Sequence, residues 1–278
     1  MPLAPLFAAA ATIPSILFVG NSFTFGALSP VEHYRADAVT DLNGEGIGGV
    51  PALFATFAEE SGQPWRVSLE TSPGKDLRWH WENRRALLDR RWSAVVMQDY
   101  STLSADHPGD GSELSDYAGR FARLFRAHSP AVRLSLTATW SRPDQTYVAA
   151  GHWAGQPIQR MALDLRAAYD RARAANRAVE RVNPAGEAFN CAIARGIADP
   201  NPYDGITPGQ VDLWASDHYH ASTAGYYLEA LVVFAGVTGA RPTTLGPQER
   251  AARDHGLAPP LAAALQKVAE DMVVRKRC

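Results

Sequence analysis

A serine follows directly on the first apolar run of the chain, in the sequence Gly20-Asn21-Ser22. At the end of a strand, a serine commonly caps the next helix by accepting a hydrogen bond from a backbone N–H group. The same N–H groups could instead stabilise an oxyanion beside a nucleophilic serine. Taken alone, this stretch favours the capping role, so the rest of the chain must decide whether Ser22 is a nucleophile.

An aspartate and a histidine near the C-terminal end have the spacing of an acid–base pair, since Asp217 precedes His220 by three residues. A serine hydroxyl needs a base to remove its proton, and histidine has a suitable pKa near neutral pH. Within a turn, the carboxylate of Asp217 could bind the imidazole N–H and stabilise the imidazolium. His218 is a poorer candidate because it lies only one residue from Asp217. Alternatively, Asp217 and His220 cap the helix that we expect to begin near Ser222.

Apolar and β-branched runs alternate with segments of helical period along most of the chain. This order predicts an α/β fold, a three-layer α/β/α sandwich with a mostly parallel, five-stranded, flavodoxin-like sheet. We expect further helices at residues 222–239 and in the final segment. The expected strands are 16–20, 66–70, 94–98, 132–138 and 180–183, and the expected helices between them are 50–60, 77–90, 114–128, 158–176 and 185–195.

In such folds, ligands bind outside the carboxyl ends of the strands. The residues that close the expected strands are therefore the first candidates for a site. Ser22 follows the first strand and Gly74 the second. Gln98 and Asp99 follow the third strand, and Trp140 follows the fourth.

The composition is that of a globular protein, with 278 residues, 46% of them hydrophobic and 20% charged, and a formal net charge of -2. Without a basic excess, the charge does not favour a nucleic-acid partner. No apolar run approaches the roughly 20 residues of a membrane-spanning helix, so we expect no transmembrane segment. Residues 1–15 are apolar, lack Lys and Arg, and fit either a trimmed export signal or an N-terminal arm. Compartment and oligomeric state stay open.

Only two cysteines occur, Cys191 and Cys278, which excludes a disulfide framework. Cys191 lies in an apolar segment, and we interpret it as a packing residue rather than a nucleophile. No CxxC motif, HExxH motif or Cys/His cluster indicates zinc. We therefore expect neither a metal nor a cofactor.

Ser22, Gly74, Gln98, Asp217 and His220 together resemble the SGNH, or GDSL-type, hydrolase superfamily. In that family the nucleophilic serine follows the first strand, usually in a Gly-Asp-Ser motif. A glycine in the second block donates its backbone N–H to the oxyanion, and an Asp-x-x-His motif supplies the acid and the base. The resemblance covers about residues 15–240 and is closest to a poorly characterised branch with a glutamine-containing third strand, here VVMQ.

The third block departs from the family pattern. The family usually has Gly-x-Asn-Asp there, with the asparagine side chain as an oxyanion donor, whereas this chain has Met-Gln-Asp-Tyr, ending at Tyr100. A glutamine amide can donate the same hydrogen bond. The resemblance therefore implies three oxyanion donors, which are the backbone amides of Ser22 and Gly74 and the side chain of Gln98.

The resemblance implies a serine hydrolase that cleaves carboxylic esters through an acyl-enzyme intermediate, with Ser22, His220 and Asp217 as catalytic residues. Short acyl groups, including O-acetyl groups on carbohydrate, are the leading substrates. The same triad would also serve an acyltransferase or a lipid or thioester hydrolase, and a decayed carbohydrate-binding module is a further alternative. Residues 13–245 would form the hydrolase domain and residues 246–278 a C-terminal helical extension packed on it.

Two long loops after the third and fourth strands carry aromatic side chains. Long loops at this edge of a sheet commonly shape a binding site. These side chains could stack on a sugar ring or line an acyl pocket, and anchoring of the loops is an equally good interpretation. A polar mouth rimmed by aromatic residues suits a small-molecule or carbohydrate ester. The candidate substrate-binding residues are Asn21, Asp99, Tyr100, Trp140, Tyr147 and Trp153.

Overall fold

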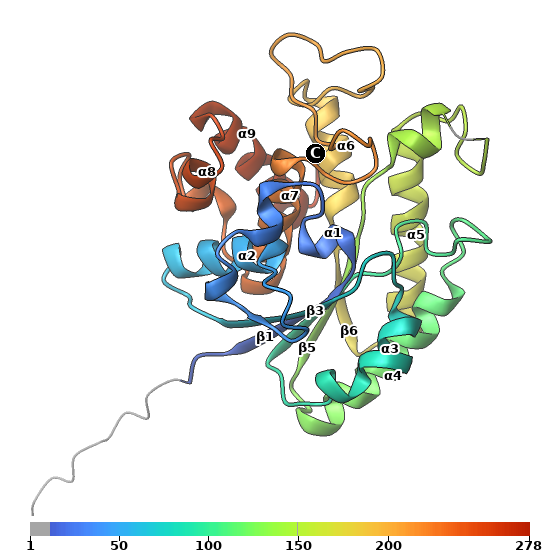
Figure 1. The fold of residues 1–278 in the computed structure, drawn as a ribbon, viewed down its shortest axis with the longest axis vertical. Coiled ribbons are helices and arrows are strands. Elements are labelled where there is room, and N and C mark those ends of the chain that lie inside the picture. Colours follow the sequence, from blue (N-terminus) through green and yellow to red (C-terminus); the bar gives the residue numbers. More distant parts are fainter. Residues whose placement is uncertain (1–11, 149) are drawn as a thin grey trace, which may run out of the picture.

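Figure 1 shows the computed structural model of the protein, which describes residues 12–148 and 150–278. Within these residues, six parallel strands form one sheet in the order β2-β3-β1-β4-β5-β6. Most of the apolar N-terminal segment lies outside the described residues. The strands are β1 Ser15–Gly20, β2 Thr40–Asp41, β3 Arg66–Thr71, β4 Ala94–Met97, β5 Arg133–Ala138 and β6 Val179–Pro184.

The central strands are apolar on both faces. In β1, Ile16 and Phe18 belong to the hydrophobic core on one side of the sheet, and Leu17 and Val19 belong to the core on the other side. A parallel strand that is covered on both faces has no solvent-facing side and therefore no need for alternating polar residues. This explains the continuous apolar runs that predicted the strands.

The sheet has six strands rather than the five expected from the sequence. All five expected strands are present in the flavodoxin-like order, and β2 is added at the edge beside β3. β2 comprises only Thr40 and Asp41, which pair with Ser68 and Leu69. Two polar residues carry no hydrophobic periodicity, so the sequence pattern could not show this strand.

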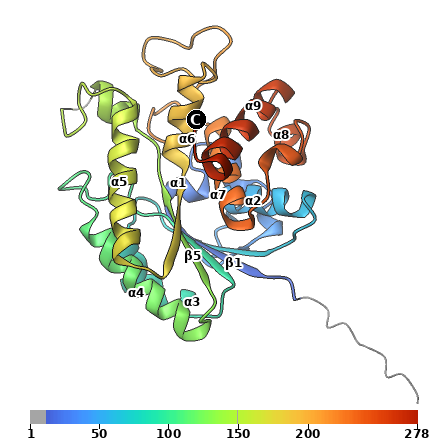
Figure 2. The ribbon, with the colours of Figure 1, turned by 180° about the vertical axis from the view of Figure 1, so that it is seen from behind.

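Helices cover both faces of the sheet (Figures 1 and 2). α3, α4 and α5 lie on one face, whereas α2 and α7 lie on the other, with α8 and α9 farther out. The helices are α1 Ser22–Phe25, α2 Gly49–Glu60, α3 Leu77–Leu88, α4 Ser112–His128, α5 Gln159–Ala175, α6 Ala185–Ala194, α7 Thr223–Thr238, α8 Arg250–Asp254 and α9 Pro259–Glu270.

α7 is buried along almost its whole length, from Ala224 to Val237. It packs on α2 and on α9, and a helix that is apolar on all sides needs such neighbours. The hydroxyl of Ser222 caps its N-terminus by accepting a hydrogen bond from the N–H of Gly225 (3.3 Å). The domain limit at residue 245 stays a prediction, although α9 beyond it packs on α7.

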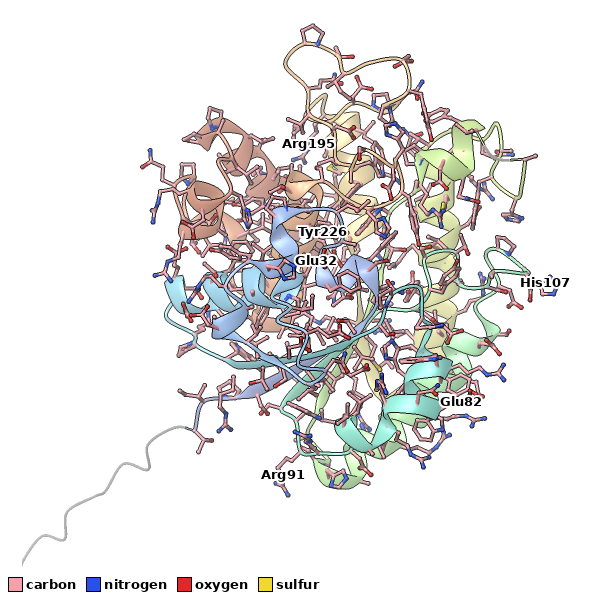
Figure 3. All side chains as sticks on the ribbon, in the orientation of Figure 1. Glu32, Glu82, Arg91, His107, Arg195 and Tyr226 are labelled. Carbon is pink, nitrogen blue, oxygen red and sulfur yellow. A yellow bond between two sulfur atoms is a disulfide. The ribbon has the colours of Figure 1, made fainter. Side chains whose placement is uncertain are left out.

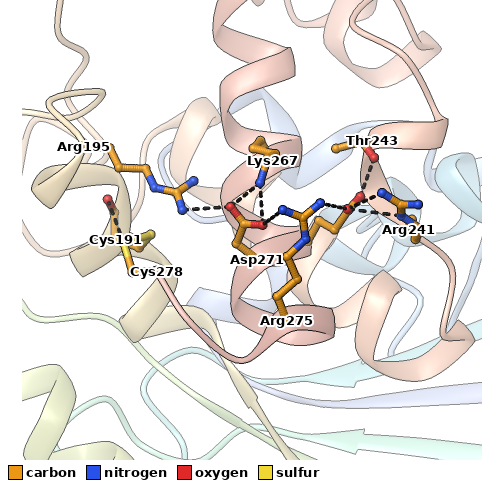
Figure 4. Close-up of polar contacts among 9 residues, drawn as sticks. Cys191, Arg195, Arg241, Thr243, Lys267, Asp271, Arg275 and Cys278 are labelled. Atoms are coloured by element: carbon orange, nitrogen blue, oxygen red, sulfur yellow. Dashed lines mark hydrogen bonds and ion pairs between the residues drawn. A yellow bond between two sulfur atoms is a disulfide. The ribbon is translucent and has the colours of Figure 1, made fainter.

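The two cysteines form a disulfide bond, which corrects the interpretation of Cys191 as a packing residue alone. Cys191 lies in α6 and Cys278 is the last residue, 87 positions later, with Cα atoms 5.5 Å apart. Figure 4 shows an ion-pair cluster beside the disulfide, in which Asp271 contacts Arg195 (2.8 Å) and Lys267. These contacts bring the C-terminal segment against α6. The pairing depends on tertiary packing, so cysteine spacing could not predict it.

Across the described ranges, we find no helix with the length and apolar character needed to cross a membrane.

Candidate active site

A tight loop carries Asp217 and His220, and Trp214 and Ala221 close it with an antiparallel bridge. One carboxylate oxygen of Asp217 accepts hydrogen bonds from the backbone N–H groups of Tyr219 (3.1 Å) and His220 (3.0 Å). The other oxygen lies 2.6 Å from Nδ1 of His220. The structure therefore brings the expected acid and base into direct contact.

The alternative role of this pair as a helix cap does not fit the structure. The N-terminus of α7 is capped by Ser222, not by Asp217 or His220. The carboxylate of Asp217 instead binds groups of its own loop.

Asp217 is held in its ionised form. Burial alone would raise its pKa, but hydrogen bonds from the His220 side chain and from the amides of Tyr219 and His220 lower the pKa below its usual value. An ionised carboxylate next to Nδ1 favours the tautomer with a proton on that nitrogen. Nε2 of His220 then has a lone pair that can accept a proton.

Ser22 is the first residue of the short helix α1 and follows β1 directly. Asn21, not Ser22, caps this helix, because its side-chain oxygen accepts a hydrogen bond from the N–H of Phe23 (3.2 Å). The hydroxyl of Ser22 has no hydrogen-bond partner in the part of the chain that the structure describes. The capping role that the local sequence favours is therefore taken by its neighbour.

Phe23 joins the Ser22 turn to the His220 loop. Its ring lies edge-to-face against the imidazole, with centroids 5.7 Å apart, and also contacts the ring of Tyr219 (5.4 Å). Tyr226, labelled near the centre of Figure 3, donates a hydrogen bond from its hydroxyl to the carbonyl of Ser22 (3.2 Å). No hydrogen bond links Ser22 to His220 within the described residues; such bonds are often long before substrate binds.

Gly74 lies in the turn that follows β3, and its backbone has the left-handed φ of 66° that favours glycine. The side chain of Asn21 donates a hydrogen bond to the carbonyl of Lys75 (2.9 Å), which fixes this turn beside the Ser22 turn. In the described ranges, the N–H groups of Ser22 and Gly74 donate no hydrogen bond. Both amides therefore remain available to an oxyanion.

Neither a protein-family model nor a curated protein matches the chain, but solved structures do. A DUF4886 family protein from Bacteroides uniformis has a TM-score of 0.62 and 16% identity, over 96% of this chain and 97% of its own. A candidate SGNH hydrolase from Slackia heliotrinireducens has a TM-score of 0.52 and 20% identity, over 80% and 98%. An acetyl-xylooligosaccharide esterase from Geobacillus, in a mutant form, has a TM-score of 0.51 and 16% identity, over 81% and 94%. The chain shares the α/β/α fold of these structures.

The side chain of Gln98, the expected third oxyanion donor, makes hydrogen bonds within the protein. Its side-chain oxygen accepts hydrogen bonds from the N–H of Asn21 (3.3 Å) and the hydroxyl of Thr24 (3.1 Å). Its NH2 group donates to the carbonyl of Asp99. Gln98 is 1% exposed and supports the Ser22 turn, and its role as an oxyanion donor stays a prediction. Gly20 is required in this packing, since a Cβ atom there would lie 2.1 Å from Oγ1 of Thr24.

Asn21 and Asp99 position loops rather than substrate, which corrects their expected role in substrate binding. The NH2 group of Asn21 donates to the carbonyls of Lys75 and Asp99 (2.9 and 3.2 Å), so its polar atoms are all engaged. The carboxylate of Asp99 accepts from the N–H groups of Leu77 and Tyr100 (3.1 and 2.7 Å). Burial raises the pKa of Asp99 to about 7, against the opposing effect of these bonds. Tyr100 itself is half-buried beside it.

Two of the candidate aromatic residues are interior. Trp140 is 0% exposed and lies in a stack between Phe23 (4.1 Å) and Phe189 (5.0 Å). Its indole N–H donates to the carbonyl of Tyr219 (3.2 Å), so Trp140 supports the Ser22 turn through Phe23 and the His220 loop through Tyr219. Trp153 is 1% exposed and is likewise a loop anchor. Contact with substrate is therefore excluded for both in this conformation, and of the candidate aromatics only Tyr147 has an exposed ring.

Sequence reasoning missed Arg142, which supports the His220 loop. Its guanidinium lies 3.5 Å from the centroid of the Tyr219 ring, and that ring packs on the imidazole of His220 (4.1 Å). The guanidinium also binds both carboxylate oxygens of Asp144 (3.0 and 2.6 Å) and the hydroxyl of Ser101 (3.0 Å). A lone arginine in the loop after β5 carries no spacing signal that would connect it to the histidine.

Among the described residues, no three His, Cys, Asp or Glu side chains are grouped as a metal site would require.

Proposed function

We propose that the protein is a serine esterase that hydrolyses carboxylic esters of short acyl groups through an acyl-enzyme intermediate. The observation that carries this proposal is the 2.6 Å contact between Asp217 and His220, on a loop packed through Phe23 against the Ser22 turn. The α/β/α fold is compatible with it. Since folds host many functions, the proposal rests on the geometry of the site.

In the proposed mechanism, Nε2 of His220 removes the proton from the hydroxyl of Ser22 while its oxygen attacks the ester carbonyl carbon. The negative charge on the carbonyl oxygen is stabilised by the amide N–H groups of Ser22 and Gly74. His220 then returns the proton to the departing alcohol. A water molecule, deprotonated by His220, then attacks the acyl group; the bond to Ser22 breaks, His220 returns the proton to the serine oxygen, and the acid leaves. Asp217 stabilises the imidazolium in both steps.

The substrate that we propose is a carbohydrate bearing O-acetyl groups. Tyr147, with its ring 41% exposed on the loop after β5, can contact a sugar from outside the site. The Geobacillus neighbour, an acetyl-xylooligosaccharide esterase, shares this fold at 16% identity and makes acetylated oligosaccharides a reasonable first substrate to test.

The proposal is tested by hydrolysis of p-nitrophenyl acetate, butyrate and octanoate together with labelling by a fluorophosphonate probe. We expect the highest kcat/KM for the acetate, and a single probe adduct on Ser22 that peptide mass spectrometry locates. Absence of both hydrolysis and labelling, in a folded sample, would rule out a serine esterase. Labelling at another serine would rule out this site.

Replacing Arg142 with methionine is expected to lower kcat for p-nitrophenyl acetate by about tenfold to a hundredfold, with KM nearly unchanged. The variant loses the cation over Tyr219, and the imidazole packed on that ring is then poorly oriented. Arg142→Lys, which keeps the charge, should recover part of the rate.

Arg120→Met is the matched control, because Arg120 also pairs with a carboxylate, Asp116 (2.9 Å), and lies over an aromatic ring, Tyr117 (4.8 Å), but does so on the exposed side of α4. It should leave kcat unchanged. Equal kcat values for the Arg142→Met and Arg120→Met variants would show that Arg142 does not position the histidine.

A further inference from the structure

Two exposed tyrosine rings lie next to the loop that carries the candidate base. Tyr147 is 41% exposed and Tyr203 is 43% exposed. Their ring centroids are 6.4 Å apart at an angle of 78°, and Tyr203 also packs on the imidazole of His218 (4.3 Å). The three rings therefore form one aromatic surface, which we call the tyrosine platform.

The tyrosine platform is joined to the candidate active site through the backbone. His218 lies between Asp217 and Tyr219, two residues before the candidate base. The N–H of Asp144 donates to the carbonyl of His218 (3.3 Å), which ties the loop of Tyr147 to the loop of the base. The platform is therefore attached directly to the loop that carries the candidate base.

The loop that carries Tyr203 is held by its own polar contacts. The carboxylate of Asp199 accepts hydrogen bonds from the N–H groups of Asn201 (2.8 Å) and Thr207 (2.9 Å). The side-chain oxygen of Asn201 in turn accepts from the N–H of Tyr203 (3.2 Å). The hydroxyl of Tyr147 donates a hydrogen bond to the carbonyl of Pro200 (3.0 Å), which links the loop of Tyr147 to the loop of Tyr203. The rings are thus positioned before any ligand binds, which lowers the entropy cost of binding.

The surroundings of the platform carry negative charge. Burial raises the pKa of Tyr203, and the charges of Asp144 and Asp217 raise it further. Burial likewise raises the pKa of Tyr147, with contributions from Asp204 and Asp199. The guanidinium of Arg142 pairs with Asp144 and neutralises that carboxylate, so the remaining negative charge comes from Asp199, Asp204 and Asp217. Such a field repels anionic ligands, while carboxylates accept hydrogen bonds from hydroxyl groups.

We propose that Tyr147, Tyr203 and His218 form a subsite for an uncharged sugar ring of the substrate, an inference that rests on the proposed function for its catalytic consequence. The flat apolar face of a sugar ring packs on exposed aromatic rings, and its hydroxyl groups face the surrounding carboxylates. An acidic sugar or a fatty-acid anion meets repulsion at the same place. The subsite therefore selects neutral oligosaccharide esters among the esters that the triad could cleave.

Binding tests this subsite without any need for hydrolysis. Calorimetric titration with xylohexaose, mannohexaose and cellohexaose, none of which carries an ester, should show binding of at least one by the wild-type chain. Hexagalacturonate, an anionic oligosaccharide of the same length, should not bind. Tyr203→Ala should weaken binding of the neutral oligosaccharide by about tenfold, and Tyr203→Phe, which keeps the ring, should restore it.

Kinetics give the second readout. With acetylated xylo-oligosaccharides, Tyr203→Ala should raise KM by about tenfold, and Tyr203→Phe should restore the wild-type KM. Equal affinities of the wild type and Tyr203→Ala, equal binding of the acidic oligosaccharide, or no binding of any neutral one would overturn the subsite. If the wild-type protein binds the neutral oligosaccharide but hydrolyses neither the acetylated oligosaccharides nor p-nitrophenyl acetate, only the proposed esterase function is contradicted.

Discussion

Replacement of Ser22 with alanine is expected to lower kcat for ester hydrolysis by about 10⁴- to 10⁶-fold, with little change in KM. The variant lacks the hydroxyl that forms the acyl-enzyme but keeps the backbone amide that contacts the oxyanion. Because this hydroxyl has no hydrogen-bond partner among the described residues, the substitution should leave Tm within about one or two degrees. Initial rates with p-nitrophenyl acetate and a thermal melt measure the two quantities.

The same prediction extends to the acid. Asp217→Asn should lower kcat by up to about 10⁴-fold, because an amide no longer favours the tautomer that leaves Nε2 of His220 unprotonated. Asp212→Asn is the matched control, since Asp212 accepts a hydrogen bond from the N–H of Trp214 (2.8 Å) in the same segment but does not touch the imidazole. If kcat of the Ser22→Ala variant stays within tenfold of the wild-type value, Ser22 is not the nucleophile.

Reduction of the disulfide between Cys191 and Cys278 is expected to lower the free energy of unfolding by about 4 to 5 kcal/mol. The bond closes a loop of 87 residues, and a loop of this length strongly restricts the unfolded chain. Urea unfolding with and without dithiothreitol, followed by circular dichroism, measures the difference. The proposed esterase activity of the folded protein should survive reduction, because neither cysteine contacts Ser22 or His220 in the described residues.

Cys278→Ser provides the control for this experiment. The variant should unfold at the urea concentration of the reduced wild type, and dithiothreitol should not shift its midpoint further. Ion pairs of Asp271 with Arg195 and Lys267 persist in the variant and keep the C-terminal segment in place under native conditions. Coincident midpoints for the oxidised and reduced wild type would show that the bond contributes no stability.

Local patterns in the sequence predicted much of the fold. Apolar runs between helical segments indicated the five main strands, most clearly β1 and β4, which are buried on both faces. The edge strand at Thr40 and Asp41 has no such pattern and depends on pairing with β3. The contact of Asp217 with His220 was predictable for a similar reason, since three residues of one turn determine it.

Features that depend on distant segments were not predictable. Gln98 has the chemistry of an oxyanion donor, but its NH2 group donates to the carbonyl of Asp99 and its oxygen binds the turn of Asn21 and Thr24. Trp140 has the chemistry of a sugar-binding residue, but Phe23 and Phe189 enclose it. In each case the residue type was informative, and the neighbours that decided its role came from other strands and helices. Tyr203 was overlooked because its place beside His218 arises only when the loops meet.

The disulfide between Cys191 and Cys278 encloses part of the candidate active site in a covalent ring and leaves the rest outside it. Residues 191–278 form a covalent ring, and Asp217 and His220 lie within it, whereas Ser22 lies outside. A protease that cuts the chain at Tyr203, whose side chain is 43% exposed, would open this ring without releasing a fragment. The two new ends would remain tethered through α6 and the C-terminus. A single cut between Cys191 and Asp217 therefore leaves the acid and the base covalently joined to the segment that carries Ser22.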